Sequence, residues 1–136
     1  MRLLGIDYGF ARIGLAFTDT SLDMILPLDA IDVRRQSDPI QFISDIVKER
    51  QIDSVVVGMP LGLGSSETTQ SIHTRSFVTK LDEAIGKESL IVDESFSSVE
   101  AGSDLPLSLP GKGRSDGRLD SASACVILRR FLNGTV

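Results

Sequence analysis

Cysteine and histidine are nearly absent from this 136-residue sequence, which contains one of each. Cys125 therefore has no partner for a disulfide within the chain, and a lone thiol in an apolar stretch is usually a small core residue, as expected in a reducing cytosol. One histidine and one cysteine are also too few for the usual structural zinc site. Neither a disulfide framework nor structural zinc is expected to hold this chain together.

Long apolar runs are missing as well. No run approaches the roughly 18 residues that a membrane-spanning helix needs. The N-terminal residues reach the charged Asp7 without the cleavage-site pattern of a secretory signal. We therefore expect a cytoplasmic protein that is neither exported nor anchored in a membrane.

Basic residues are fewer than acidic ones: the sequence has 14 Lys and Arg and 19 Asp and Glu, which gives a net charge of −5. This balance argues against a protein that coats nucleic acid by nonspecific attraction. It does not exclude a nuclease, because bound divalent cations would become the largest local charges. The length and the 41% hydrophobic content suit one domain that spans residues 1–136.

Short apolar runs followed by helical patterns predict an α/β fold. The first two runs form a hairpin around Gly9. Consecutive Val55, Val56 and Val57 favour a central parallel strand, whereas Pro27 confines its strand to a sheet edge. The predicted strands are 2–7, 13–18, 24–31, 52–58 and 89–93. The first predicted helix has Pro39 in its first turn and Ser37 or Asp38 as its cap. The other predicted helices cover 67–85, with Gly86 as the cap, and 119–132, after a loop at 102–117.

Apolar residues at helical spacing support two of the predicted helices. In the helix after Asp38 they form one buried stripe of Ile40, Ile43, Ile46 and Val47, and the helix at 67–85 is predicted from Ile72, Phe77, Val78, Leu81 and Ile85. The element order is that of the RNase H-like architecture, a five-stranded mixed sheet with an antiparallel meander, then parallel strands, and helices on both faces.

Four acidic residues fall at positions that such a sheet can bring together. Asp7 ends the first strand, Asp93 and Glu94 end the fifth, and Asp120 begins the last helix. The carboxyl ends of parallel strands face one crevice, and oxygen ligands of this kind suit Mg²⁺ or Mn²⁺. Each acid taken singly could be only a turn or helix cap, but together they favour a metal-dependent nuclease site. Asp93 and Glu94 point to opposite faces, so one of them is expected to bind metal.

Several ordered strings resemble a known family. They are Gly5-Ile6-Asp7-Tyr8-Gly9 with Arg12-Ile13-Gly14-Leu15-Ala16, Val56-Val57-Gly58-Met59-Pro60-Leu61, Gln70 with Arg75 and Phe77, Asp93-Glu94, and Leu119-Asp120 with Ala122 and Ala124. In order and spacing they resemble the YqgF family of RuvX-like Holliday junction resolvases, also described as nucleases that mature the 16S ribosomal RNA precursor. The resemblance implies a bacterial cytoplasmic enzyme with an RNase H-like fold. It also implies that the catalytic, metal-binding acids are Asp7, Glu94 and Asp120.

The same resemblance implies a nucleic acid substrate, either structured RNA such as a ribosomal RNA precursor or branched DNA. Symmetric cutting of two strands would favour a homodimer, whereas trimming RNA would suit a monomer. Two basic positions of the family pattern are replaced here by Ala11 and Ser95. The residues expected to contact phosphate are Arg12, Arg75, Lys112, Arg114 and Arg118.

Two other functions compete with a nuclease. A sugar-kinase or actin-like ATPase would share the first glycine-rich hairpin, but such proteins close two domains over ATP, and this chain has the length of one. The glycine-containing segment 59–66 also lacks the Walker lysine pattern. The other alternative is a non-catalytic module on the same fold that binds nucleic acid or a transcription or ribosome factor, and the loss of basic residues at Ala11 and Ser95 favours it.

Overall fold

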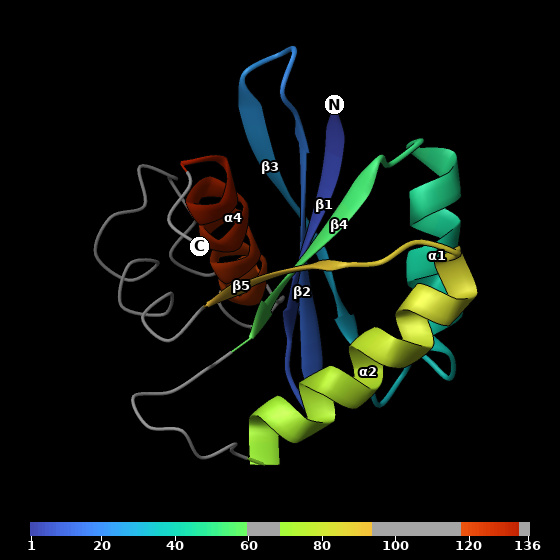
Figure 1. Cartoon of the computed structure of the whole chain (residues 1–136). Coiled ribbons are helices and arrows are strands. Elements are labelled where there is room, and N and C mark those ends of the chain that lie inside the picture. Colours follow the sequence, from blue (N-terminus) through green and yellow to red (C-terminus); the bar gives the residue numbers. More distant parts are fainter. Residues whose placement is uncertain (60–68, 94–117, 134–136) are drawn as a thin grey trace.

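A five-stranded mixed sheet organises the part of the chain that the computed structural model describes, which is residues 1–59, 69–93 and 118–133, with the side chains of 118–120 excluded. The strand order is β3-β2-β1-β4-β5 (Figure 1). None of the described helices is long and apolar enough to cross a membrane. The elements are β1 (Arg2–Tyr8), β2 (Arg12–Asp19), β3 (Met24–Asp32), α1 (Pro39–Glu49), β4 (Ser54–Met59), α2 (Thr69–Ile85), β5 (Leu90–Asp93) and α4 (Arg118–Leu132).

The pairing of the strands confirms the predicted RNase H-like sheet. β1, β2 and β3 form the antiparallel meander, while β4 pairs in parallel with both β1 and β5. Pro27 lies in the edge strand β3, where a missing amide donor does not interrupt a central ladder. Val55, Val56 and Val57 lie in β4 between β1 and β5 and are at most 1% exposed, as predicted for a strand that is buried on both faces.

Helices α1 and α2 cover one face of the sheet. Alternate residues of β1, such as Leu4 and Ile6, point to this face. They join Ile43 of α1 and Phe77 and Leu81 of α2 in one apolar cluster. Among the described residues this cluster is the larger of two, and it fixes the sheet against both helices.

Helix α4 covers the opposite face, so the prediction of helices on both faces is confirmed (Figure 1). Leu3 of β1 and Val92 of β5 pack on this side against Cys125 and Leu128. Gly5 of β1 lies directly beneath α4, because a Cβ atom there would be 2.6 Å from Cγ of Leu128. The missing side chain lets the helix approach the strand closely.

The direction of α4 follows from its contacts. Near its N-terminus, Ser121 accepts a hydrogen bond from the amide of Leu15, which pairs with Ile6. Near its C-terminus, Leu132 lines a groove together with Thr18, which pairs with Leu3. Helix α4 therefore runs antiparallel to β1, and its first turn lies at the carboxyl end of that strand.

Most boundary differences from the predictions have local causes. The fourth strand begins at Ser54, not at residue 52, because the amide of Ile52 bonds to the Val47 carbonyl in the turn after α1. The fifth begins at Leu90, because Ser89 bonds to the Asp82 carboxylate. The predicted start of the second helix at 67 and the predicted loop at 102–117 lie outside the described residues.

The helix ends were predicted from cap chemistry. Asp38 caps α1 by accepting the amide of Gln41, and Pro39 occupies the first helical position. Gly86 follows α2 with a φ of 71°, the left-handed conformation that glycine adopts without strain. Of the two caps that the sequence left open for α1, Ser37 and Asp38, the structure selects Asp38, and the prediction for Gly86 is confirmed.

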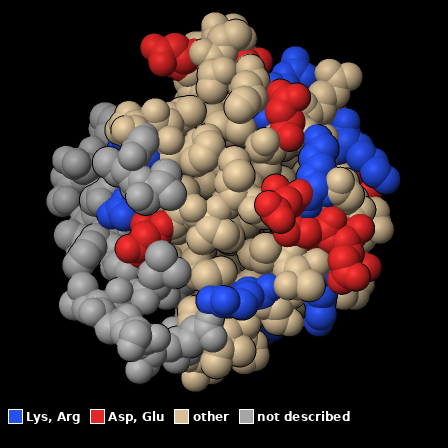
Figure 2. Space-filling model, viewed as in Figure 1, with Lys and Arg blue, Asp and Glu red and all other residues tan. Residues whose placement is uncertain are grey.

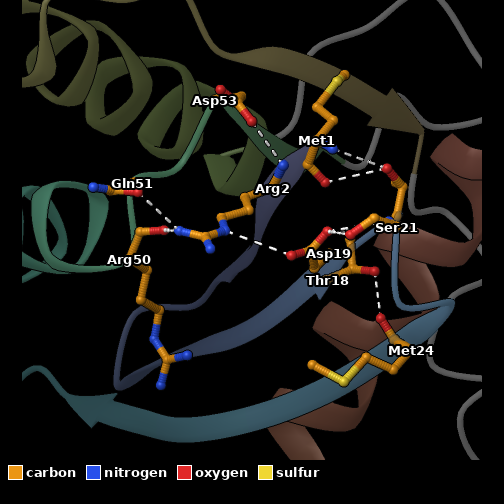
Figure 3. Close-up of polar contacts among 10 residues, drawn as sticks. Met1, Arg2, Thr18, Asp19, Ser21, Met24, Arg50, Gln51 and Asp53 are labelled. Carbon is orange, nitrogen blue, oxygen red and sulfur yellow. Dashed lines mark hydrogen bonds and ion pairs between the residues drawn. The ribbon is translucent and has the colours of Figure 1, made fainter.

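The amino end of the sheet is held by a polar network (Figure 3). The Arg2 guanidinium donates to the Arg50 carbonyl at 3.0 Å and to the Gln51 side chain at 3.1 Å, and it lies 3.5 Å from the Asp19 carboxylate. The Asp53 carboxylate accepts the amide of Arg2 at 2.8 Å. These contacts tie β1 to β2 and to the segment after α1, at the end of the sheet opposite to Asp7.

Candidate functional site

Asp7 lies at the carboxyl end of β1 on the face that α4 covers. Side chains alternate along a strand, and Leu3 and Gly5 both meet α4. Asp7 is therefore on the same side, where it is partly buried. Its partners in register are Gly14 of β2 and Gly58 of β4. The carboxylate thus stands between two positions that carry no side chain, so neither neighbouring strand fills the space beside it.

Asp120 lies in the first turn of α4. Its own side chain is outside the description, but the next residue, Ser121, is fully buried and fixed to the sheet. Ser121 Oγ donates to the Leu28 carbonyl and accepts the amide of Leu15. These bonds place the backbone of Asp120 at the same end and on the same face of the sheet as Asp7.

The structure of β5 bears on whether Asp93 or Glu94 faces the same side of the sheet as Asp7. Val92 packs on the α4 face and Ile91 on the opposite face, so alternation puts Asp93 on the side away from Asp7. Its carbonyl oxygen accepts a hydrogen bond from Nη1 of Arg130 at 2.7 Å. Glu94 follows directly and lies outside the described residues.

The predicted metal site is therefore described only in part. Among the side chains of residues 1–59, 69–93 and 121–133, no three His, Cys, Asp or Glu lie close enough to hold one ion. Two of the three predicted ligands, Glu94 and Asp120, have side chains outside these ranges. The shared metal site of Asp7, Glu94 and Asp120 stays a prediction, and its donor set is made of the carboxylates that Mg²⁺ and Mn²⁺ take.

The structure describes two of the five residues that are expected to contact phosphate. Arg12 begins β2 opposite Asp32, and Arg75 is exposed on α2. Lys112 and Arg114 lie outside the described residues, as does the side chain of Arg118. On the face shown in Figure 2, basic and acidic side chains intermingle over the side of α1 and α2. This face therefore shows no separation of the basic residues from the acidic ones over α1 and α2.

The structure also gathers residues that were not combined in the sequence. Tyr8 points away from Asp7 and packs on Phe77 of α2, with ring centroids 4.5 Å apart. The Gln70 side chain donates to the Tyr8 carbonyl at 2.8 Å and ties the start of α2 to the end of β1. His73 and Lys80, on the same helix, line a pocket with Tyr8. Only the fold brings these residues together, because more than 60 positions separate Gln70 from Tyr8.

The arrangement is that of an RNase H-like α/β protein, and comparison with solved structures agrees. Thermus thermophilus RuvC in complex with a Holliday junction substrate matches with a TM-score of 0.61 and 12% identity, over 98% of this chain and 96% of that one. The fowlpox virus Holliday junction resolvase matches with a TM-score of 0.58 and 10% identity over the whole of both chains. At such low identity these matches establish the fold alone.

The sequence comparisons establish the family. The family model RuvX, described as Holliday junction resolvase, matches residues 1–134. Curated relatives named "Putative pre-16S rRNA nuclease" include one from Anaeromyxobacter sp. strain Fw109-5, 35% identical over 98% of both chains, and one from Sulfurimonas denitrificans, 37% identical over 97% of both. The chain belongs to the RuvX family, which confirms the resemblance found in its sequence.

Proposed function

We propose that this chain is a metal-dependent nuclease that hydrolyses nucleic acid phosphodiesters, with Asp7, Glu94 and Asp120 as its catalytic, metal-binding acids. The observation that carries the proposal is the common position of Asp7 and the first turn of α4, at one end and on one face of the sheet. The position of Asp93 on the other face supports Glu94 as the third acid. Family membership supports the reaction.

The chemistry requires positive charge beside an anionic substrate. Bound Mg²⁺ or Mn²⁺ would supply it by activating a water molecule and stabilising the leaving oxygen. The role of the chain is to hold carboxylates in place. Strand β1 gives Asp7 a defined backbone position, and its register partners Gly14 and Gly58 contribute no side chains beside it. Ser121 fixes the turn that carries Asp120.

Two substrates are compatible with the comparisons. The curated relatives are named for the 16S ribosomal RNA precursor and the family for the Holliday junction. Arg12, Arg75, Lys112, Arg114 and Arg118 are the proposed phosphate contacts for either substrate. A branched DNA substrate would call for a homodimer, because two strands are cut symmetrically, and an RNA substrate would allow a monomer. We also infer that the chain acts in the cytoplasm as one nuclease domain.

The test compares cleavage of a labelled 16S precursor fragment and of a four-way DNA junction, each with Mg²⁺, with Mn²⁺ and with EDTA. Asp7→Asn keeps the size of the side chain and removes its charge, so we expect cleavage to fall about 10²–10³-fold, the range seen when one group that stabilises the transition state is lost. Asp45→Asn is the matched control, because Asp45 is an exposed residue of α1 on the other side of the sheet. Cleavage of neither substrate by the wild type at any metal concentration would favour the non-catalytic binding module instead.

A further inference from the structure

A pocket lies on the other side of β1 from Asp7. Tyr8 follows Asp7 directly, and its side chain points to the face that α1 and α2 cover. The pocket has a volume of about 210 Å³, and we call it the Tyr8 pocket; the residues that define it are Tyr8, Ile13, Val33, His73, Phe77 and Lys80. It therefore opens at the same end of the sheet as the proposed catalytic acids.

The walls of the Tyr8 pocket combine apolar and aromatic surface with a few polar groups. Ile13 is 1% exposed and Phe77 is 7% exposed, so both are fixed in the core. The volume is below the roughly 300–1,000 Å³ that drug-sized ligands occupy. A pocket of this size and character suits one flat ring system, such as a single nucleobase.

An exposed aromatic side chain stands at the edge of this pocket. Phe10, in the turn between β1 and β2, is 54% exposed. Its ring contacts His73 edge-on, with centroids 4.9 Å apart and an interplanar angle of 80°. The two rings lie on elements distant in sequence and together form an aromatic rim. Stacking on aromatic side chains is the usual means by which proteins hold single-stranded bases.

A lysine lines the same opening, and an arginine follows another of its lining residues. Lys80 lines the pocket from α2. Val33 lines it from the turn after β3, and its amide bonds to the Ala11 carbonyl at 2.9 Å, which holds this turn beside the turn of Phe10. Arg34 follows Val33, and its side chain is 78% exposed and lies 3.7 Å from the Asp32 carboxylate. Such exposed pairs are weak, so the guanidinium is free to approach a phosphate.

We propose that the Tyr8 pocket binds the base of a nucleotide that flanks the cleaved phosphodiester. Phe10 and His73 stack on this base, and Lys80 and Arg34 contact its phosphate. The position of this nucleotide beside a cleaved bond rests on the proposed nuclease function. The nucleotide strand then crosses the carboxyl end of β1, with the cleaved phosphate at Asp7 and the flanking base on the opposite face.

Binding can be measured without cleavage. Fluorescence anisotropy of a labelled single-stranded oligonucleotide with the wild-type chain in EDTA gives the affinity, and amide chemical shifts give the place of contact. Phe10→Ala is expected to weaken binding by roughly 5- to 150-fold, the range for one stacked base. Lys80→Gln is expected to weaken it and to reduce its salt dependence. Phe42→Ala and Lys48→Gln are the matched controls, because both are exposed residues of α1 that do not line the pocket.

Three results would overturn the proposal. The first is unchanged affinity in both Phe10→Ala and Lys80→Gln. The second is chemical shift changes that fall away from Tyr8, His73 and Lys80. The third is binding of a free nucleoside monophosphate as tight as that of the oligonucleotide, which would make the ligand a free nucleotide and not part of a substrate strand.

The binding test of the Tyr8 pocket and the cleavage test of the proposed function can fail independently. If the wild type cleaves nothing while Phe10→Ala still weakens binding, the pocket stands as a nucleotide site and the nuclease proposal falls. If Asp7→Asn abolishes cleavage while the pocket variants bind normally, the pocket proposal falls alone.

Discussion

Gly5 of β1 and Leu128 of α4 are in such close contact that a Cβ atom at Gly5 would lie 2.6 Å from Cγ of Leu128. The same Cβ atom would lie 3.0 Å from the carbonyl oxygen of Ala124. The second contact involves backbone, so the helix as a whole would have to move. The distance between β1 and α4 thus depends on the absence of one side chain, two residues before Asp7.

Gly5→Ala should therefore lower both stability and cleavage. Overpacking of this kind destabilises proteins by about 1–3 kcal/mol, measurable by chemical denaturation. Cleavage should fall as well, because a displaced α4 carries Asp120 away from Asp7. Leu128→Ala removes one of the two contacts, so the double variant should lose less stability than the sum of the single losses. Strictly additive losses would show that the two residues do not oppose each other.

Ser121→Ala tests the bonds that fix the start of α4. Ser121 is fully buried, and its loss leaves the Leu28 carbonyl and the Leu15 amide without this partner. We expect a decrease of about 1–3 kcal/mol in the free energy of unfolding. Ser37→Ala, at an exposed position before α1, should change stability by less than about 0.5 kcal/mol. Equal effects of the two substitutions would contradict the anchoring role.

Asp19 should make stability depend on pH. Hydrogen bonds from the hydroxyl and then the amide of Ser21 lower the pKa of the Asp19 carboxyl. A lowered pKa in the folded state stabilises the fold above the unfolded-state value of about 3.9, and this stabilisation is lost as the pH falls through the folded-state pKa. Unfolding of the wild type and of Asp19→Asn, measured between pH 7 and pH 3, should show a difference that shrinks on acidification. In a Ser21→Ala background, the difference in stability that Asp19→Asn causes at pH 7 should also be smaller. A difference that is constant with pH would contradict the assignment.

Cys125 should be unreactive in the folded protein. Burial in the α4 core raises the pKa of its thiol to about 11, against an opposing influence of Arg129. The thiolate is the reactive form, so an aromatic disulfide reagent at pH 8 should modify the native chain only as fast as it unfolds. In denaturant the same thiol should react at once. Rapid modification of the native chain would show that this part of the core opens readily.

Much of the fold could be predicted because local chemistry and tertiary structure agree. The valine run of β4, Pro27 in an edge strand, Asp38 as a cap and Gly86 after α2 each have one favourable structural setting. Ile72, one of the apolar residues whose spacing predicts α2, is 53% exposed, whereas Ser71 and Thr74 are buried. Small polar residues can be buried where they find hydrogen bonds, and Thr74 bonds to the Gln70 carbonyl. Apolar periodicity contains no information about such partners.

For the candidate site, the sequence predicted which strand ends and helix starts lie together, while the role of the three acids stays a prediction. Strand ends and helix starts identified Asp7 and Asp120, because sheet topology alone brings those points together. The Tyr8 pocket could not be predicted, since it depends on how closely α2 packs against β1. Its aromatic pair, Tyr8 and Phe77, is 69 positions apart, and nothing in the sequence indicates that the two rings meet.

The most direct test asks whether a cation binds beside Asp7. Mn²⁺ added to the isotopically labelled chain broadens the resonances of nearby amides, and the readout does not depend on cleavage. We predict that broadening centres on Asp7, Gly58 and Ser121 and disappears in Asp7→Asn but not in Asp45→Asn. Broadening that centres elsewhere, or that persists unchanged in Asp7→Asn, would contradict a metal-dependent site at the carboxyl end of β1.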